Sequence, residues 1–279
     1  MAQIHIKANR PWLYIDWRGI LQYRDLLWLL VVRDFVVLYK QSILGPLWFI
    51  IQPLATTIVF VVVFGHIAKI GTGGIPNLLF YMSGTIFWTY FHNCLIKISG
   101  ALISNANLFK KVFFPRLIVP FSIVVSNLGI LLLNLIMLAA FFLYFLFYTE
   151  ARIAPGLELV VVLPLLILQC ATIGLGVGLW VSALTVKYRD LGFAVPFLSQ
   201  LWMFMTPVVY PVSEFPAKWR WILKINPMTS VMELARHSLF GVETMWQEYI
   251  VSGAILAVIL LVTGVLVFNK VQRTFVDTI

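Results

Sequence analysis

Six long stretches without a single Asp, Glu, Lys or Arg constrain what this chain can fold into. A helix needs about 20 mostly apolar residues to cross a hydrocarbon core of about 30 Å, and each stretch reaches that length. We therefore predict an all-α integral membrane protein with six transmembrane helices. The stretches are residues 41–68, 70–96, 117–149, 159–186, 191–213 and 249–269.

The composition agrees with this fold class and excludes several others. The 279 residues are 61% hydrophobic and 11% charged, whereas soluble domains carry about a quarter charged residues. A soluble enzyme, a disordered chain and a secreted disulfide scaffold are therefore excluded. Cys94 and Cys170 both lie in apolar stretches, so we expect packed thiols and no disulfide.

The N-terminal region precedes the first predicted span. Residues 26–38 are apolar but include Arg33 and Asp34, so we expect a helix that lies on the membrane surface. Charges occur throughout residues 1–25, so we expect no signal peptide there. We predict one transmembrane domain over residues 1–279, made of a cytoplasmic N-terminus with the interface helix (1–43), the six-helix membrane domain (44–269) and a cytoplasmic tail (270–279).

The distribution of Lys and Arg predicts the orientation. The formal net charge is +9, and the whole excess lies in the termini and in the loops on their side. By the positive-inside rule both termini are cytoplasmic. We attribute the basic excess to topology and to contact with anionic membrane lipids, and we expect no nucleic-acid partner.

Several chemistries are missing from the sequence. No predicted span has an acid or base in its interior, which disfavours a channel or an ion-coupled carrier. His92 lies near the end of the second predicted span, and we interpret it as a packing residue. No G-x-x-x-x-G-K-[ST] motif occurs, and the histidines and cysteines lack metal-ligand spacing. We expect no catalytic residue, no metal and no cofactor in this chain, and energy supplied by another subunit.

A glycine pattern in the fourth span has a structural interpretation. Gly174, Gly176 and Gly178 superficially resemble a nucleotide-binding fingerprint, but they lie in the middle of a predicted span. Gly174, Gly178 and Ser182 follow one another at intervals of four residues, on one helix face. Small residues at this spacing let two membrane helices approach closely, so we predict a helix-packing surface.

Two segments outside the spans are informative. Residues 99–116 are basic, amphipathic and free of acids, which fits either an orientation anchor or a helix that docks a cytoplasmic partner. Residues 210–248 are too polar to span and too apolar to lie in water, so we predict re-entrant helices at about 210–240. The candidate docking residues are Asn105, Asn107, Leu108, Phe109, Lys110 and Lys111.

Two spans carry similar stripes of aromatic and amide side chains at helical spacing. Such a face suits carbohydrate, because rings contact C–H surfaces while amides bond hydroxyls, and plain helix packing remains the alternative. We predict that the stripes line a channel. They consist of Phe49, Gln52, Thr56 and Phe60 in the first span, and of Phe193, Phe197, Gln200 and Phe204 in the fifth.

From about residue 10 to 270 the sequence resembles the ABC-2 type permeases that export O-antigen, capsular polysaccharide or teichoic acid. The run from Tyr39 to Pro53 is the most specific part. The matching motifs are Arg33-Asp34, Leu38-Tyr39-Lys40-Gln41-Ser42-Ile43-Leu44-Gly45-Pro46-Leu47-Trp48, Gln52-Pro53-Leu54, Val63-Phe64-Gly65, Phe114-Pro115-Arg116, Tyr188-Arg189-Asp190, Thr206-Pro207-Val208 with Tyr210, and Asn226-Pro227.

The resemblance implies a homodimer that works with two copies of a separate ATPase subunit, which binds ATP and Mg²⁺. It implies that residues 99–116 and the interface helix contact this ATPase. It also implies that Leu44 and Gly45 lie at the cytoplasmic channel mouth, where an undecaprenyl-linked polysaccharide presents its pyrophosphate. Location alone places Arg33, Lys40 and Arg116 at this mouth.

Together these observations predict the permease subunit of an ATP-driven exporter in the bacterial inner membrane, with a lipid-linked, O-antigen-like polysaccharide as its substrate. The alternative is an ABC-2 exporter of a small hydrophobic compound or lipid, which would share the topology.

Overall fold

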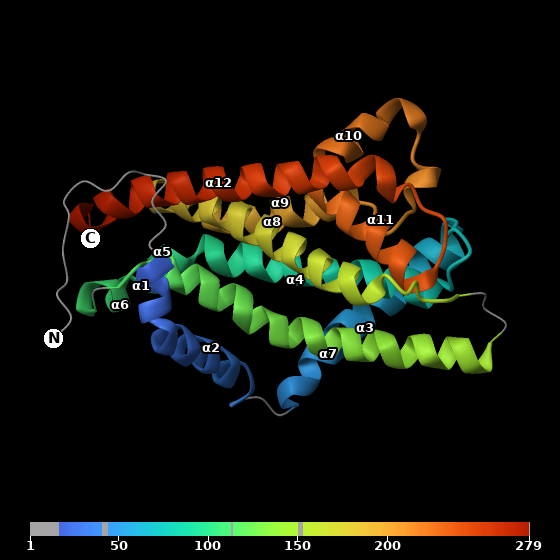
Figure 1. Ribbon diagram of the computed structural model, residues 1–279, viewed down its shortest axis with the longest axis horizontal. Coiled ribbons are helices and arrows are strands. Elements are labelled where there is room, and N and C mark those ends of the chain that lie inside the picture. Colours follow the sequence, from blue (N-terminus) through green and yellow to red (C-terminus); the bar gives the residue numbers. More distant parts are fainter. Residues whose placement is uncertain (1–16, 41–43, 113, 150–152, 279) are drawn as a thin grey trace.

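The structure is a computed structural model that describes residues 17–40, 44–112, 114–149 and 153–278. Every regular element in these ranges is a helix, which confirms the all-α prediction. The long helices lie roughly along one axis and form an elongated bundle (Figure 1). The short helices α5 and α6 and the C-terminal part of α12 lie at one end of the bundle, which we call the α6 end.

Among the described residues, four helical segments are long and apolar enough to cross a membrane. They correspond to four of the six predicted spans. The first begins at Gly45, because Leu44 before it is not helical, and residues 41–43 of that predicted span lie outside the described ranges. The segments are Gly45–Ile67, formed by η1 (Gly45–Leu47), α3 (Trp48–Phe60) and η2 (Val61–Ile67); α7 (Ile118–Tyr148); α8 (Leu159–Lys187); and Trp246–Gln272 of α12 (Trp246–Thr278).

The second predicted span forms α4 (Asn77–Ser99), which begins later than expected. Gly73 and Gly74 have positive φ angles, and Pro76 occupies the N-cap position, so residues 70–76 form a turn. α4 packs against α7, α8 and α3 at the centre of the bundle, and 16 of its 23 residues are buried. It is too polar to qualify as a span by composition.

The fifth predicted span, 191–213, is wrong at its C-terminal end. Helix α9 covers Leu191–Met205, and the next residue, Thr206, has extended dihedral angles. Pro207 explains the stop, because proline lacks a backbone N–H and disfavours the helical conformation of the residue before it. At 15 residues, α9 alone is shorter than a membrane span.

The glycines of α8 lie at helix contacts, as predicted. A Cβ atom on Gly174 would lie 2.9 Å from the Cβ of Cys94, and one on Gly178 would lie 2.8 Å from the Cβ of Ile98, both on α4. On another face, a Cβ on Gly176 would lie 2.6 Å from the backbone of Leu260 in α12. Absent side chains therefore let α8 approach both of its main neighbours.

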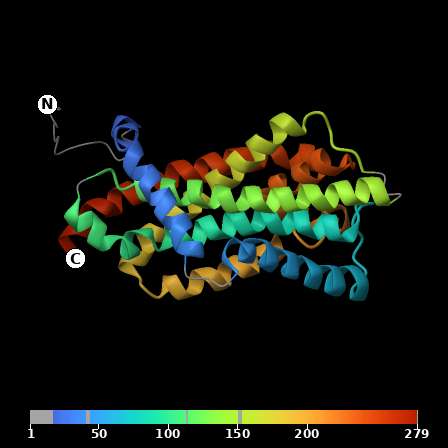
Figure 2. The same cartoon turned by 90° about the horizontal axis from the view of Figure 1, so that it is seen from below.

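The predicted interface helix forms α2 (Arg24–Tyr39), which follows the short α1 (Trp17–Gln22). α2 crosses α7 obliquely (Figure 2), and the ring of Phe35 lies where α7 has Gly129. Residues 99–116 include α5 (Ala101–Ser104) and α6 (Ala106–Lys111).

The segment between α9 and α12 contains η3 (Val212–Glu214), η4 (Ala217–Trp219), α10 (Arg220–Ile225) and α11 (Pro227–Phe240). The segment predicted to form helices at about 210–240 thus contains helices, and in the longest of them, α11, 12 of the 14 residues are buried. α11 packs on α12 and α8. The re-entrant arrangement stays a prediction, because it depends on how deeply these helices lie in a membrane.

Candidate functional site

A groove lined by both polar and apolar side chains opens near the α6 end, between α2, the C-terminal end of α4, α5 and the first turns of α7. Its volume is about 570 Å³. Each of these helices contributes side chains because α2 lies across α7 while α4 ends in Gly100 and turns into α5. The groove is lined by Arg33, Asp34, Val37, Ile96, Lys97, Gly100, Ser104, Asn105, Val119, Ile123, Ser126 and Asn127.

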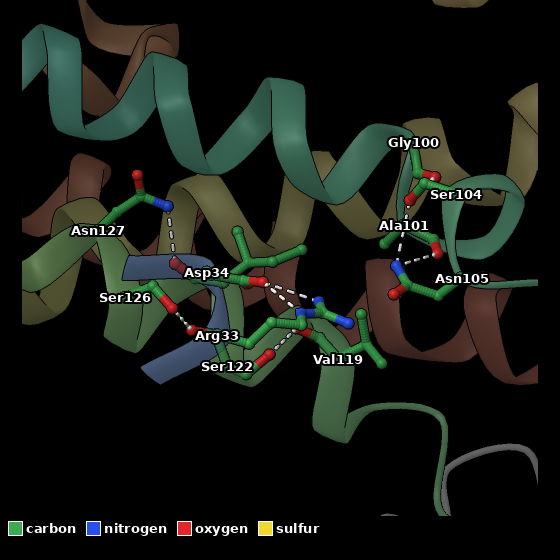
Figure 3. Close-up of polar contacts among 11 residues, drawn as sticks. Arg33, Asp34, Gly100, Ala101, Ser104, Asn105, Val119, Ser122, Ser126 and Asn127 are labelled. Carbon is green, nitrogen blue, oxygen red and sulfur yellow. Dashed lines mark hydrogen bonds and ion pairs between the residues drawn. The ribbon is translucent and has the colours of Figure 1, made fainter. Parts of the chain in front are cut away.

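Three charged side chains face this groove. Nε and Nη2 of Arg33 both donate to Oδ1 of Asp34, at 2.9 and 2.7 Å (Figure 3). On the α4 side, Nζ of Lys97 donates to Oδ1 of Asn127 at 3.0 Å. The Asn127 amide is oriented by its own bond to the carbonyl of Ile123, at 2.7 Å. Two cations and one carboxylate give the groove a net positive charge.

Hydroxyl and amide groups complete the polar wall. Ser126 donates to the carbonyl of Ser122 at 2.7 Å, and Ser104 donates to the carbonyl of Gly100 at 2.9 Å (Figure 3). Both hydroxyls give their single proton to a backbone carbonyl, so the charged donors that remain for an anionic ligand are those of Arg33 and Lys97. Among the described residues, no three His, Cys, Asp or Glu side chains gather as a metal site.

The residues predicted at the channel mouth do not all gather in this groove. Arg33 lines it, while Lys40 is exposed at the end of α2, and Leu44 and Gly45 precede α3. Arg116 instead donates from Nη1 to the backbone carbonyl of Gln272 in α12 and lies 5.7 Å from the Phe109 ring centroid. Burial lowers the pKa of Arg116. Assignment of these five residues to a mouth stays a prediction.

Sequence reasoning missed the partners of Arg33 in the groove. The sequence predicts no site role for Lys97 or Asn127, and it marks Asp34 only as a charge of the interface helix and as part of the Arg33-Asp34 motif. A usable signal existed, since Lys97 ends an otherwise uncharged stretch and Ser126-Asn127 interrupts an apolar helix. Nothing in the sequence indicated that α2 would bring Asp34 toward both.

The predicted docking residues lie at the α6 end. Asn105 is half-buried and donates to the carbonyl of Ala101 at 3.0 Å, which terminates α5. Leu108 and Phe109 are half-buried, and the Phe109 ring centroid lies 5.6 Å from that of Phe114. Asn107, Lys110 and Lys111 are exposed. α6 therefore presents an amide and two cations outward while its apolar side faces the bundle; its role as a docking helix stays a prediction.

The two predicted stripes lie on helices that flank α4 and follow the same edge of the bundle (Figure 2). On α9 the rings are uncovered: Phe193, Phe197 and Phe204 are 86%, 64% and 45% exposed. Gln200 is also exposed.

On α3 the stripe is mixed. Gln52 is exposed, while Phe49 and Thr56 are half-buried. Phe60 is buried and packs against Phe64 and against Tyr81 of α4, with ring centroids 5.5 and 6.5 Å apart. Phe60 therefore supports the α3–α4 contact, and the channel role of the stripe stays a prediction.

Comparisons with known proteins identify the family. The model of the family described as "ABC-2 type transporter" matches residues 25–240. An O-antigen export system permease protein RfbA from Klebsiella pneumoniae is 30% identical over 255 residues, which cover 91% of this chain and 94% of the relative. A protein of the same name from Myxococcus xanthus is 30% identical over 266 residues, 94% of this chain and 98% of the relative.

A more distant relative, the polysialic acid transport protein KpsM from Escherichia coli, is 26% identical over 215 residues, 75% of this chain and 79% of the relative. The family match includes α2 through α11, and hence the groove, both stripes and the α5–α6 segment. With its four apolar helices, the chain is a multi-pass membrane protein. It belongs to the ABC-2 type transporter family.

Proposed function

We propose that this chain is the membrane-spanning subunit of an ATP-driven exporter that moves a lipid-linked, O-antigen-like polysaccharide across the bacterial inner membrane. The observation that carries the proposal is the 30% identity, over more than nine-tenths of the chain, with permeases named for O-antigen export. ATP and Mg²⁺ are bound by a partner ATPase. The purified chain alone is therefore expected to hydrolyse no ATP, and turnover in a partner-free preparation would contradict this.

In this proposal the chain crosses the membrane six times with both termini in the cytoplasm. The four long apolar helices make four crossings, and buried α4 makes another. The fifth crossing along the chain begins with α9, which is too short to span the membrane alone. We assign the rest of the membrane thickness at this place to α10 and the buried α11, as a re-entrant pair of helices. The α6 end is cytoplasmic, which agrees with the excess of Lys and Arg on that side.

Two copies of the chain form the channel, as is usual for a closed twofold assembly. The exposed rings of α9 and the exposed part of the α3 stripe support this arrangement, since both helices follow one edge of the protomer (Figure 2). A sliding glycan needs many weak contacts, and ring faces supply contacts of about 0.5–1.5 kcal/mol each, by analogy with aromatic pairs.

The groove between α2, α4 and α7 is the proposed site of the lipid diphosphate. An ammonium group has three donors, of which Lys97 gives one to Asn127. Charged hydrogen bonds of this kind are the strong ones for phosphate oxygens. Arg33 is the second cation, held in place by Asp34. The exposed face of α6 contacts the ATPase.

Deletion of the gene in its native host tests the function. Lipid-linked glycan should accumulate on the cytoplasmic side while surface glycan is lost, and the wild-type gene should restore display. Normal surface glycan in the deletion strain would contradict the proposal. Retention of a small hydrophobic compound, with normal glycan display, would favour the alternative exporter.

A further inference from the structure

Helix α9 ends inside the protein, and the chain that follows is irregular. Residues 206–211, which we call the α9 break, follow Met205 and precede η3. Val208 and Val209 in this break are buried. Irregular backbone surrounded by apolar groups is costly unless its N–H and C=O groups find partners within the protein. The break therefore needs donors for its free carbonyl groups.

Arg236 of α11 supplies these donors. Its side chain is 2% exposed. Nη2 donates to the carbonyl of Val208 at 2.8 Å, and Nη1 contacts the carbonyl of Tyr210 at 3.4 Å. The planar guanidinium also stacks on Phe80 of α4, 3.7 Å from the ring centroid. One side chain thus joins α11, the α9 break and α4, in a geometry that a lysine ammonium cannot reproduce.

The neighbouring residues are adapted to this arrangement. A Cβ on Gly84 of α4 would lie 2.9 Å from the carbonyl oxygen of Val208 and 3.3 Å from Nη2 of Arg236. Only glycine lets the break and the guanidinium approach α4 this closely. One turn before Arg236, the buried Glu233 accepts a hydrogen bond from the backbone N–H of Met245 at 3.0 Å. α11 therefore holds the segment before it, the α9 break, through Arg236, and the segment after it, at Met245, through Glu233.

We propose that Arg236 is a positioning residue that holds the α9 break against α4 and thereby keeps the aromatic face of α9 in register with α4. Other contacts also hold α9. Asn226 at the N-cap of α11 accepts a hydrogen bond from Nε1 of Trp202 at 3.1 Å and donates one to Oγ1 of Thr206 at 2.8 Å, and the Trp202 ring packs on α4. In the middle of α9, Nδ1 of His92 on α4 lies 2.7 Å from Oγ of Ser199. Arg236 is distinct from these contacts because its guanidinium holds carbonyl groups of the break itself. The consequence for export rests on the proposed function, whereas the anchoring itself is a property of the chain alone.

Thiol labelling of the full chain in lipid nanodiscs tests the anchoring. A cysteine replacing the buried Val209 reports whether the break leaves α4, since Cys94 and Cys170 are buried. In the Arg236→Gln and Arg236→Lys variants, labelling should be about tenfold faster or more, because the buried carbonyl of Val208 and the part-buried carbonyl of Tyr210 lose their donor. Failure of lysine to restore protection would separate the guanidinium geometry from simple charge.

Ser230→Ala is the matched control. Ser230 is buried on the same helix but is bonded by Gln169 of α8 at 2.8 Å, away from the break. This variant should leave the cysteine at position 209 protected. Gly84→Ala disrupts the same contact from α4, because the added Cβ meets the carbonyl of Val208 and the guanidinium. It should expose the cysteine at position 209, and it provides the test if the Arg236 variants fail to fold.

Protection in all Arg236 variants and in Gly84→Ala would overturn the proposal. Equal exposure in Ser230→Ala would also overturn it, because loosening of α11 in general would then explain the labelling. Export by the assembled complex is measured in parallel. Exposure of the break without loss of export would refute the link to transport and leave the anchoring intact.

Discussion

In helices α4 and α9 burial does not follow hydropathy: the more polar helix is the more buried one. α4 carries serine, threonine, asparagine, histidine and lysine, yet 16 of its 23 residues are buried at the centre of the bundle. α9 is apolar, yet only Val195, Ser199 and Met203 of its 15 residues are buried. In a soluble protein the two would exchange places.

The difference follows from the solvent. Lipid chains are as apolar as leucine, so an apolar helix gains little by entering the protein, whereas polar groups and small residues join helices. α4 uses both means. Thr85 and Thr57 share a hydrogen bond of 3.0 Å between α4 and α3, and the glycines of α8 receive Cys94 and Ile98. α9 keeps its three phenylalanine rings outward, where a ligand or a second copy can meet them.

The largest expected effect concerns two phenylalanines of the predicted stripes. Phe60→Ala should lower the free energy of unfolding by about 3–5 kcal/mol, because the ring fills the α3–α4 contact. Phe197→Ala should change it by less than about 0.5 kcal/mol, since its ring is exposed. Thermal stability in one detergent measures both, and equal losses would remove the contrast.

For export the order should be reversed: the exposed rings of α9, which matter little for stability, should be needed for transport. Alanine at Phe193, Phe197 and Phe204 together should stop export while the complex still assembles, because three weak glycan contacts are lost at once. Normal export by this triple variant would assign the face to lipid or protein packing.

The next effect compares glycines at the two helices. Gly178→Leu should destabilise by about 1–3 kcal/mol or more, because any Cβ there meets Ile98 of α4. Gly192→Ala in the first turn of α9 has no atom within 4 Å of the added Cβ. Alanine there should be neutral or stabilising by up to about 1 kcal/mol. A tolerated Gly178→Leu would show that α4 is not closely packed on α8.

The sequence predicts those features of the fold that depend on local composition, and it does not predict those that depend on tertiary packing. Uncharged length defined α7, α8, α12 and the first span, because crossing a hydrocarbon core requires it. Thr206-Pro207 carries a local stop signal that an uncharged stretch conceals, so the end of α9 was misplaced. The way in which the groove assembles and the role of Arg236 were not predictable, since Asp34 with Lys97, and Arg236 with Val208, meet only through tertiary packing.

The smallest effect concerns polar groups at the α6 end. Lys97→Gln should weaken binding of undecaprenyl diphosphate to the complex by about tenfold, the usual range for one charged hydrogen bond. Lys40→Gln is the matched control, because Lys40 is exposed outside the groove. A larger loss of affinity with Lys40→Gln would indicate that the headgroup binds at the end of α2 and not in the groove.

Photocrosslinking of a stalled complex tests the central claim most directly, namely that the exposed face of α9 meets the exported glycan. A photoreactive phenylalanine analogue at Phe197, with the ATPase blocked, should yield an adduct that glycan-specific antibody recognises. The control places the analogue at Leu165 of α8, which is also exposed, at 56% against 64% for Phe197. The account predicts glycan adducts at position 197 and phospholipid adducts at 165. Phospholipid alone at both positions would contradict it.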